Sequence, residues 1–286
     1  MRRRAALAAA ACALAGPRAA RALMAGAAPD TPEARIDPNL ASSPWAGVVA
    51  VRVGGGVYSG ALVHPRFVLT AAHVAAGRPP AEVSIQVNAG PEARRLEAAA
   101  IRVHPGWKGF TRPFAFDDVA LVELAAPAPD GVPVYRPFVG AMRAGTVLTF
   151  VGYGASGHGD RGPEVGADAA VRRVGRNRAE RFVDAPGGRG RPAIFLYDFD
   201  GPDASTNAFG GPSLGNAVET SAASGDSGAP AFVRRGEFPQ VAGVLTFVAD
   251  YNRPGTRHAT FGASGGGMLL SGVAGWLQAT LAAAVR

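Results

Sequence analysis

Short apolar runs rich in β-branched residues recur along this chain and predict strands rather than helices. Two of them adjoin side chains that can do chemistry: residues 68–72 lead into His73, and Asp118 opens residues 118–124. Only the C-terminal segment, residues 272–286, follows a helical period, with its apolar positions at Val273, Trp276, Leu277 and Leu281. The pattern therefore predicts a mostly β protein with one terminal helix.

Composition agrees with that prediction. The 286 residues are 48% hydrophobic, which is enough for a large core, and 39 glycines and 23 prolines interrupt the chain with turns. Such frequent turns favour all-β over helical architecture. No apolar stretch of about twenty residues is suited to a membrane helix.

The segment Ser221–Gly228 contains Gly225-Asp226-Ser227-Gly228, which offers a candidate nucleophile. A serine hydroxyl needs a base within hydrogen-bond reach and a third group that orients that base. His73 and Asp118 are the best candidates for these roles, and the order His, Asp, Ser occurs on double β-barrels. Asp117 competes with Asp118, but successive strand side chains point to opposite faces. The other histidines lack a comparable context and are interpreted as solvated or structural: His64, His104, His158 and His258.

Three ordered motifs resemble those of trypsin- or chymotrypsin-like serine proteases: Thr70-Ala71-Ala72-His73, Asp118-Val119-Ala120-Leu121 and Gly225-Asp226-Ser227-Gly228. Further similar segments are residues 59–63, 152–154 and 244–247. The resemblance implies two antiparallel six-stranded β-barrels and a C-terminal helix that packs on the second barrel. It places His73 and Asp118 in an N-terminal barrel over 23–145, and Ser227 in a C-terminal barrel over 146–286. Residues 155–222 are expected to form long surface loops, and 272–286 the helix.

The same resemblance implies roles for other residues. The N–H groups of Gly225 and Ser227 would form the oxyanion hole. Ser221 would lie at the base of the primary pocket, and Thr246, Phe247 and Val248 would bind substrate, with the Thr246 hydroxyl bonded to Asp118. Ser221 stands where relatives that cleave after Arg or Lys have an aspartate, and Leu245 stands where relatives that cleave after Glu have a histidine. Val248 stands where relatives with an open pocket have a glycine. We therefore expect a preference for small or medium apolar residues rather than Arg, Lys or Glu.

Residues 1–22 predict a signal peptide, with three arginines, an apolar stretch and Ala20-Arg21-Ala22 as the cleavage site. The protein is therefore expected to be secreted or periplasmic. The five arginines of this segment account for most of the formal charge of +7. Without them the chain has a net charge of about +2, which does not indicate nucleic-acid binding. The single cysteine, Cys12, also lies there, so the mature chain would have no disulfide, as in bacterial-type members; lipidation of Cys12 and twin-arginine export are lesser alternatives.

Cleavage after Ala22 would expose Leu23-Met24-Ala25-Gly26, which resembles the activating N-terminus of the family. The resemblance implies that the new ammonium pairs with Asp226. Processing after Arg35, which would start the chain at Ile36, is the rival hypothesis.

Residues 198–203 carry alternate acids, Asp198, Asp200 and Asp203, which are reminiscent of a calcium loop. The downstream glutamate is missing at the loop spacing, so a solvated turn without metal is predicted.

Two functions follow from these observations. The first is a monomeric exported endopeptidase that needs no cofactor and acts on proteins or peptides, without nucleic-acid or membrane partners. The alternative is a non-catalytic protease-fold binding protein. An esterase of the α/β-hydrolase class is disfavoured because Ser227 does not lie in a Gly-x-Ser-x-Gly motif and the candidate residues do not follow the order Ser, Asp, His.

Overall fold

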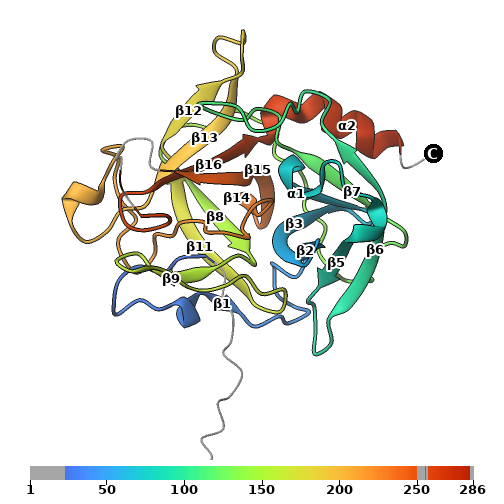
Figure 1. The fold of residues 1–286 in the computed structure, drawn as a ribbon, viewed down its shortest axis with the longest axis horizontal. Coiled ribbons are helices and arrows are strands. Elements are labelled where there is room, and N and C mark those ends of the chain that lie inside the picture. The colour runs from blue at the N-terminus through green and yellow to red at the C-terminus, as the bar shows by residue number, and fades with distance from the viewer. Residues whose placement is uncertain (1–22, 250–254, 256, 284–286) are drawn as a thin grey trace, which may run out of the picture.

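The computed structural model describes residues 23–249, 255 and 257–283 (Figure 1). The predicted signal peptide over 1–22, with Cys12, lies outside the described residues.

The first half of the chain forms a closed barrel with the strand order β2-β3-β4-β7-β6-β5. Its six strands are β2 (Val48–Val53), β3 (Gly56–His64), β4 (Phe67–Thr70), β5 (Val83–Val87), β6 (Arg94–Val103) and β7 (Ala120–Leu124). Apolar side chains of β2, β4 and β7 are buried inside it. The predicted N-terminal barrel is present. His73 follows the end of β4, and Asp118 precedes the start of β7.

The second half forms an eight-stranded sheet in the order β1-β11-β8-β14-β15-β16-β13-β12, shown mainly in yellow to red in Figure 1. Its strands are β1 (Ile36–Asp37), β8 (Thr146–Gly152), β11 (Arg172–Ala179), β12 (Arg181–Asp184), β13 (Pro192–Asp198), β14 (Pro230–Arg235), β15 (Phe238–Ala249) and β16 (Ser264–Leu269). Only Glu180 separates β11 from β12, so one bent strand joins the two ends of the sheet, and the Glu180 N–H donates to the Leu196 carbonyl at 2.8 Å. The all-β prediction is confirmed, with one closed six-stranded barrel and, where a second six-stranded barrel was expected, a larger sheet of eight strands.

Residues 155–222 differ from the predicted run of loops. They contain β11, β12 and β13, as well as a hairpin of β9 (Ser156–His158) and β10 (Gly162–Val165). The sequence of β11 is polar, yet Arg172 and Arg173 are fully buried. Arg172 bonds to the Asp37 carboxylate at 3.0 Å and to the carbonyls of Val48 and Asn88, and these partners allow a charged side chain to occupy the interior.

The helical segments are short: η1 (Pro32–Arg35), α1 (Ala72–Ala75), η2 (Pro80–Glu82), η3 (Ala204–Thr206), η4 (Leu270–Val273) and α2 (Ala274–Ala283). The predicted terminal helix is present, but α2 lies against the first barrel rather than the second (Figure 1). The Trp276 ring is 5.1 Å from the His104 ring, and residues of β6 and β7 border the groove beside the helix. An apolar stripe predicts burial without specifying the partner. Among the described residues, no helix is long and apolar enough to cross a membrane.

The N-terminal segment, drawn in blue in Figure 1, runs along the second sheet before the chain enters the first barrel. Ile36 and Asp37 pair with Arg173 and Arg172 of β11. The segment therefore belongs structurally to the half of the molecule that carries Ser227.

Candidate active site

His73 and Asp118 meet at the end of the first barrel. His73 lies in α1 directly after β4, and Asp118 lies two residues before β7, which pairs with β4. The Nδ1 atom of His73 is 2.7 Å from Oδ2 of Asp118, and the backbone N–H of His73 donates to Oδ1 at 2.8 Å. Asp118 is only 1% exposed. Because an ionised carboxylate only accepts hydrogen bonds, this contact puts the proton on Nδ1 and leaves Nε2 as the basic atom.

Asp117 does not compete for His73. Its carboxylate lies 3.6 Å from Nδ1 of His104, and its backbone has a φ of 57° that turns it away from the strand direction. Burial is the main cause that lowers the pKa of His104, whereas the charge of Asp117 raises it. The choice between the two aspartates made from the motif therefore agrees with the geometry.

Ser227 and His73 line one cavity of about 250 Å³, which also contains residues from the predicted substrate strand. The cavity is bordered by His73, Phe110, Ala222, Ala223, Ser224, Asp226, Ser227, Leu245, Thr246, Phe247, Val248 and His258. Side chains from both halves of the molecule thus converge, with His73 contributed by the first barrel and Ser227 by the second.

Ser59 of β3 holds the Ser227 loop against the first barrel. Its N–H donates to the Ser227 carbonyl at 3.0 Å, and its Oγ donates to the Gly225 carbonyl at 3.1 Å. Gly225 has a φ of 95°, and a Cβ there would lie 2.9 Å from the Val57 carbonyl oxygen. A side chain at this position is excluded both by the backbone conformation and by space.

Asp226 fixes the same loop from inside. It is fully buried, and its carboxylate accepts hydrogen bonds from the N–H groups of Gly154 at 2.9 Å, Ala223 at 3.0 Å and Leu23. Burial raises the pKa of Asp226 to about 7, against the opposing effect of these donors and of the Arg173 charge. Burial thus opposes ionisation of Asp226, and the three donors and Arg173 favour it.

Leu23 lies beside this carboxylate. The residue is fully buried, its carbonyl accepts a hydrogen bond from the Ser156 hydroxyl, and the Met24 N–H donates to the Ser221 carbonyl at 2.9 Å. Ile36, the rival N-terminus, is 39% exposed and pairs with Arg173 on the edge of the sheet.

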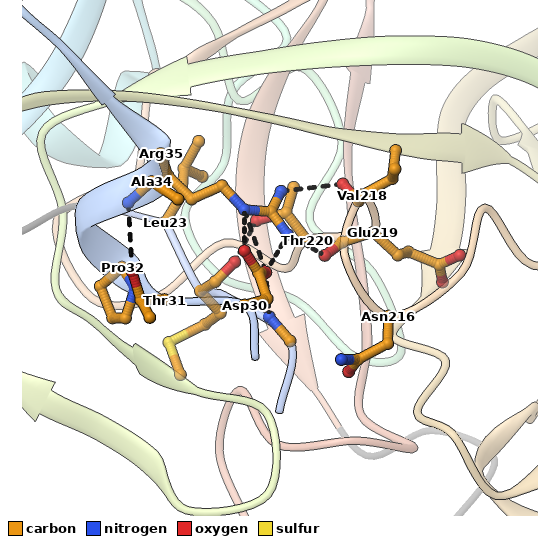
Figure 2. Close-up of polar contacts among 12 residues, drawn as sticks. Leu23, Asp30, Thr31, Pro32, Ala34, Arg35, Asn216, Val218, Glu219 and Thr220 are labelled. Carbon is orange, nitrogen blue, oxygen red and sulfur yellow. Dashed lines mark hydrogen bonds and ion pairs between the residues drawn. The ribbon is translucent and has the colours of Figure 1, made fainter. Parts of the chain in front are cut away.

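Arg35 ties the N-terminal segment to the chain that leads to the cavity (Figure 2). Its guanidinium pairs with Asp30 and donates to the carbonyls of Val218 at 2.8 Å and Glu219 at 3.1 Å. Figure 2 shows the Glu219 carboxylate pointing away from Arg35. The arginine that would precede a cut before Ile36 is thus engaged in a buried contact.

The predicted substrate residues divide into two groups. Thr246, Phe247 and Val248 line the cavity, as expected. Ser221 is fully buried and is not among the residues that border the cavity, and its hydroxyl donates to the Ala222 carbonyl at 3.1 Å. Tyr197 lies behind this wall, and its hydroxyl accepts from the Ala222 N–H at 3.1 Å. Ala222, rather than Ser221, therefore borders the cavity.

Thr246 does not make the predicted hydrogen bond to Asp118. Its Oγ1 is buried without a hydrogen-bond partner among the described residues. Asp118 is instead satisfied by the ring and backbone of His73. The motif located the residue correctly but did not fix the direction of its hydroxyl.

Two cavity residues were not predicted to lie there: Phe110 was not singled out, and His258 was interpreted as solvated or structural. Phe110 is 75% exposed, and its ring centre lies 5.2 Å from that of His73. His258 borders the cavity next to the substrate strand, and burial lowers its pKa. A large exposed aromatic residue beside Gly109 is a signal that could have identified Phe110, whereas His258 is brought in only by the tertiary fold.

A family model for trypsin matches residues 37–264, which is most of the chain and contains all three candidate catalytic residues. The comparison with curated proteins gives no match.

Proposed function

The chain belongs to the trypsin family, and we propose that it is an exported serine endopeptidase with Ser227 as nucleophile, His73 as general base and acid, and Asp118 as the group that orients His73. The observation that carries the proposal is the 2.7 Å contact between His73 and Asp118 at the edge of the cavity that Ser227 borders. Membership of the family supports protein or peptide substrates.

The reaction would proceed in two halves. Oγ of Ser227 attacks the scissile carbonyl carbon while Nε2 of His73 takes its proton. The resulting oxyanion accepts hydrogen bonds from the N–H groups of Gly225 and Ser227. When the tetrahedral intermediate collapses, the C–N bond breaks and His73 protonates the leaving amine. Water then attacks the acyl-enzyme with His73 as base, which releases the carboxylic acid and restores the Ser227 hydroxyl.

Substrate backbone would add to β15 as an antiparallel strand. The proposed specificity follows from the side chains around the cavity. Ala222 and Val248, which border it, are apolar. A Cβ at Gly265 would meet the Tyr197 hydroxyl oxygen at 2.3 Å, so the Tyr197 side chain fills the space beside Gly265. A short apolar side chain fits this environment better than Arg, Lys or Glu. A peptide panel cleaved fastest after Arg or Glu would contradict this part of the proposal.

Signal cleavage before Leu23 would complete the enzyme without a separate zymogen step. The ammonium of Leu23 would replace its amide N–H beside Asp226 and supply the charge that a buried carboxylate requires. N-terminal sequencing of exported protein would test this step. A chain that starts at neither Leu23 nor Ile36 would contradict both the Leu23 and the Ile36 hypotheses.

Covalent labelling tests the proposed function. The exported protein and its Ser227→Ala variant are treated with a fluorophosphonate, and the intact mass and modified peptide are determined. We expect one adduct on Ser227 in the wild-type chain and none in the variant. A correctly processed chain that remains unlabelled would instead indicate a non-catalytic binding protein.

A further inference from the structure

Three buried carboxylates meet at the end of strand β13 in the second sheet. Asp198 ends β13, Asp200 follows two residues later, and Glu219 comes after a long loop over residues 201–218. Each offers an oxygen within 4.8 Å of the others, and the three residues are 0%, 3% and 2% exposed. The predicted solvated turn is thus wrong for Asp198 and Asp200.

The existing hydrogen bonds position these carboxylates but do not neutralise them. Glu219 accepts from the N–H groups of Asp200 at 2.9 Å and Leu214 at 2.7 Å, and from the Ser213 hydroxyl at 2.9 Å. Oδ2 of Asp198 accepts from the Phe209 N–H at 2.7 Å. None of the ion pairs within the described part of the chain involves any of the three carboxylates.

Two oxygens of the cluster, Oδ1 of Asp198 and Oδ1 of Asp200, are buried and receive no hydrogen bond from a donor among the described residues. The side chain next to Asp198 is that of Glu180, another acid. A buried carboxylate oxygen without a partner carries a large desolvation cost, which a cation would relieve. These orphaned oxygens are an observation separate from the grouping of the acids, and they point to a ligand.

A fourth carboxylate increases the repulsion. Glu180, at the junction of β11 and β12, accepts from the Asp198 N–H at 3.1 Å. Four carboxyl groups this close together in the interior repel one another when ionised, and a cation among them would remove that repulsion.

We propose that Asp198, Asp200 and Glu219 bind a calcium ion that fastens the loop over residues 201–218 to the second sheet. The donors are all oxygens, which hard cations such as calcium prefer, whereas typical zinc sites include histidine nitrogen or cysteine sulfur. Ligands about 2.3–2.6 Å from one ion lie up to about 5 Å apart, which matches the observed spacing. Glu219 is the acidic partner that the sequence of residues 198–203 lacks, supplied from the far end of the loop.

The position of this site connects it to the candidate active site. Glu219 is followed by Thr220, whose hydroxyl donates to the Met24 carbonyl at 2.6 Å, and then by Ser221 and the cavity residue Ala222. Arg35 holds the Glu219 carbonyl from the opposite side (Figure 2). Bound calcium would therefore stabilise the cavity wall and the residues that contact the segment beginning at Leu23. The effect of calcium on catalysis rests on the proposed function, whereas the binding itself does not.

Calorimetric titration with calcium chloride tests the site in the exported Ser227→Ala protein, which cannot digest itself, after removal of metals with a chelating resin. We expect one calcium per chain and a thermal midpoint that rises by several degrees on saturation, on the order of 5 °C. Asp200→Asn, which keeps the shape of the side chain and removes its charge, should weaken binding about tenfold or more. Glu92→Gln, the same charge change at an exposed position of the first barrel, should bind like the parent.

Hydrogen exchange locates the ion without relying on a variant that could fail to fold. Calcium should slow amide exchange in peptides covering residues 199–220 and leave residues 48–103 of the first barrel unchanged. The absence of saturable binding, undiminished binding by a folded Asp200→Asn chain, or protection elsewhere would overturn the proposal. Fluorophosphonate labelling of the wild-type chain reports separately on the proposed function.

Discussion

The two halves of the molecule position their share of the candidate active site in different ways. In the first barrel, a closed ladder of six strands buries an apolar core, and the ends of the paired strands β4 and β7 bring His73 to Asp118. In the second sheet, the loop of Ser227 rests on the buried Asp226, which in turn contacts the N-terminal segment. Packing suffices to place the base, whereas charge must be balanced to place the nucleophile.

Buried charges are concentrated in the second half, on side chains including Arg172, Arg173, Asp198, Asp200, Glu219 and Asp226. Buried ions cost free energy unless they are paired. The second half therefore depends on partners from other segments: Asp37 of β1 for Arg172 and, by our proposals, the Leu23 ammonium for Asp226 and calcium for the acidic cluster. We expect changes in the first barrel to alter chemistry alone, and changes in the second to alter chemistry and stability together.

The largest effect is expected from Asp118→Asn in the first barrel. The amide would favour the wrong tautomer of His73, and kcat should fall by about 10⁴-fold with little change in Tm. Peptide hydrolysis and thermal unfolding are the measurements. The matched control is Asp117→Asn, which changes the neighbouring residue that contacts His104 and should keep wild-type kcat; an equal loss in both variants would contradict the assigned orienting role.

The second-largest effect is expected from a displaced N-terminus, which should disturb the position of the Ser227 loop. One extra residue before Leu23 would move the ammonium by about 3.5 Å and leave Asp226 without its charge partner. We expect kcat/KM to fall by about 10²-fold, because the Ser227 loop loses its fixed position. A chain that starts at Leu23 is the control, and equal activity of the two chains would refute activation at this residue.

The same pair of chains should differ in the pH dependence of stability. In the extended chain the pKa of Asp226 is raised from 3.8 to about 7 by burial, so the folded state retains a proton that the unfolded state has lost. Its free energy of unfolding should fall as pH rises from 4 to 7. The Leu23 ammonium should reduce that fall, since the other raised carboxylates are common to both chains. Urea unfolding across this range is the measurement; identical slopes would argue against an ion pair.

A smaller effect concerns the shape of the cavity. Val248→Gly should open its wall and raise the ratio of kcat/KM for a substrate with Phe before the cleaved bond to that for one with Val, by about tenfold. Competition between the two peptides in one reaction gives this ratio directly. An unchanged ratio would mean that Val248 does not limit the pocket.

The smallest effect is expected at Phe110, which lies against His73 but is largely exposed. Phe110→Ala should raise KM by about threefold, since the ring offers contact area to substrate but no chemistry. Steady-state kinetics would separate this from a loss of kcat, which would instead show that the ring helps to hold His73.

The sequence predicted the parts of the site that are encoded locally. Each catalytic candidate lies within its own short motif, and the apolar runs beside His73 and Asp118 specify the strands that bring these motifs together. The polar strand β11 was missed because Arg172 and Arg173 become core residues only through partners such as Asp37 and Pro32, far away in the chain.

Contacts between distant segments account for the other differences. The loop over residues 201–218 separates Glu219 from Asp198 and Asp200, so spacing could not show that the three acids meet. Likewise, the apolar stripe of the terminal helix did not reveal that Trp276 would contact His104 in the first barrel.

The proposed mechanism requires that Ser227 forms an acyl-enzyme with the help of His73. Stopped-flow mixing of the processed enzyme with the p-nitrophenyl ester of a small apolar amino acid would detect this intermediate. We predict a burst of one nitrophenol per enzyme, an acyl group on Ser227 by mass, a strongly slowed burst in His73→Ala and none in Ser227→Ala. The absence of a burst from correctly processed enzyme, or acylation that persists in Ser227→Ala, would contradict the account.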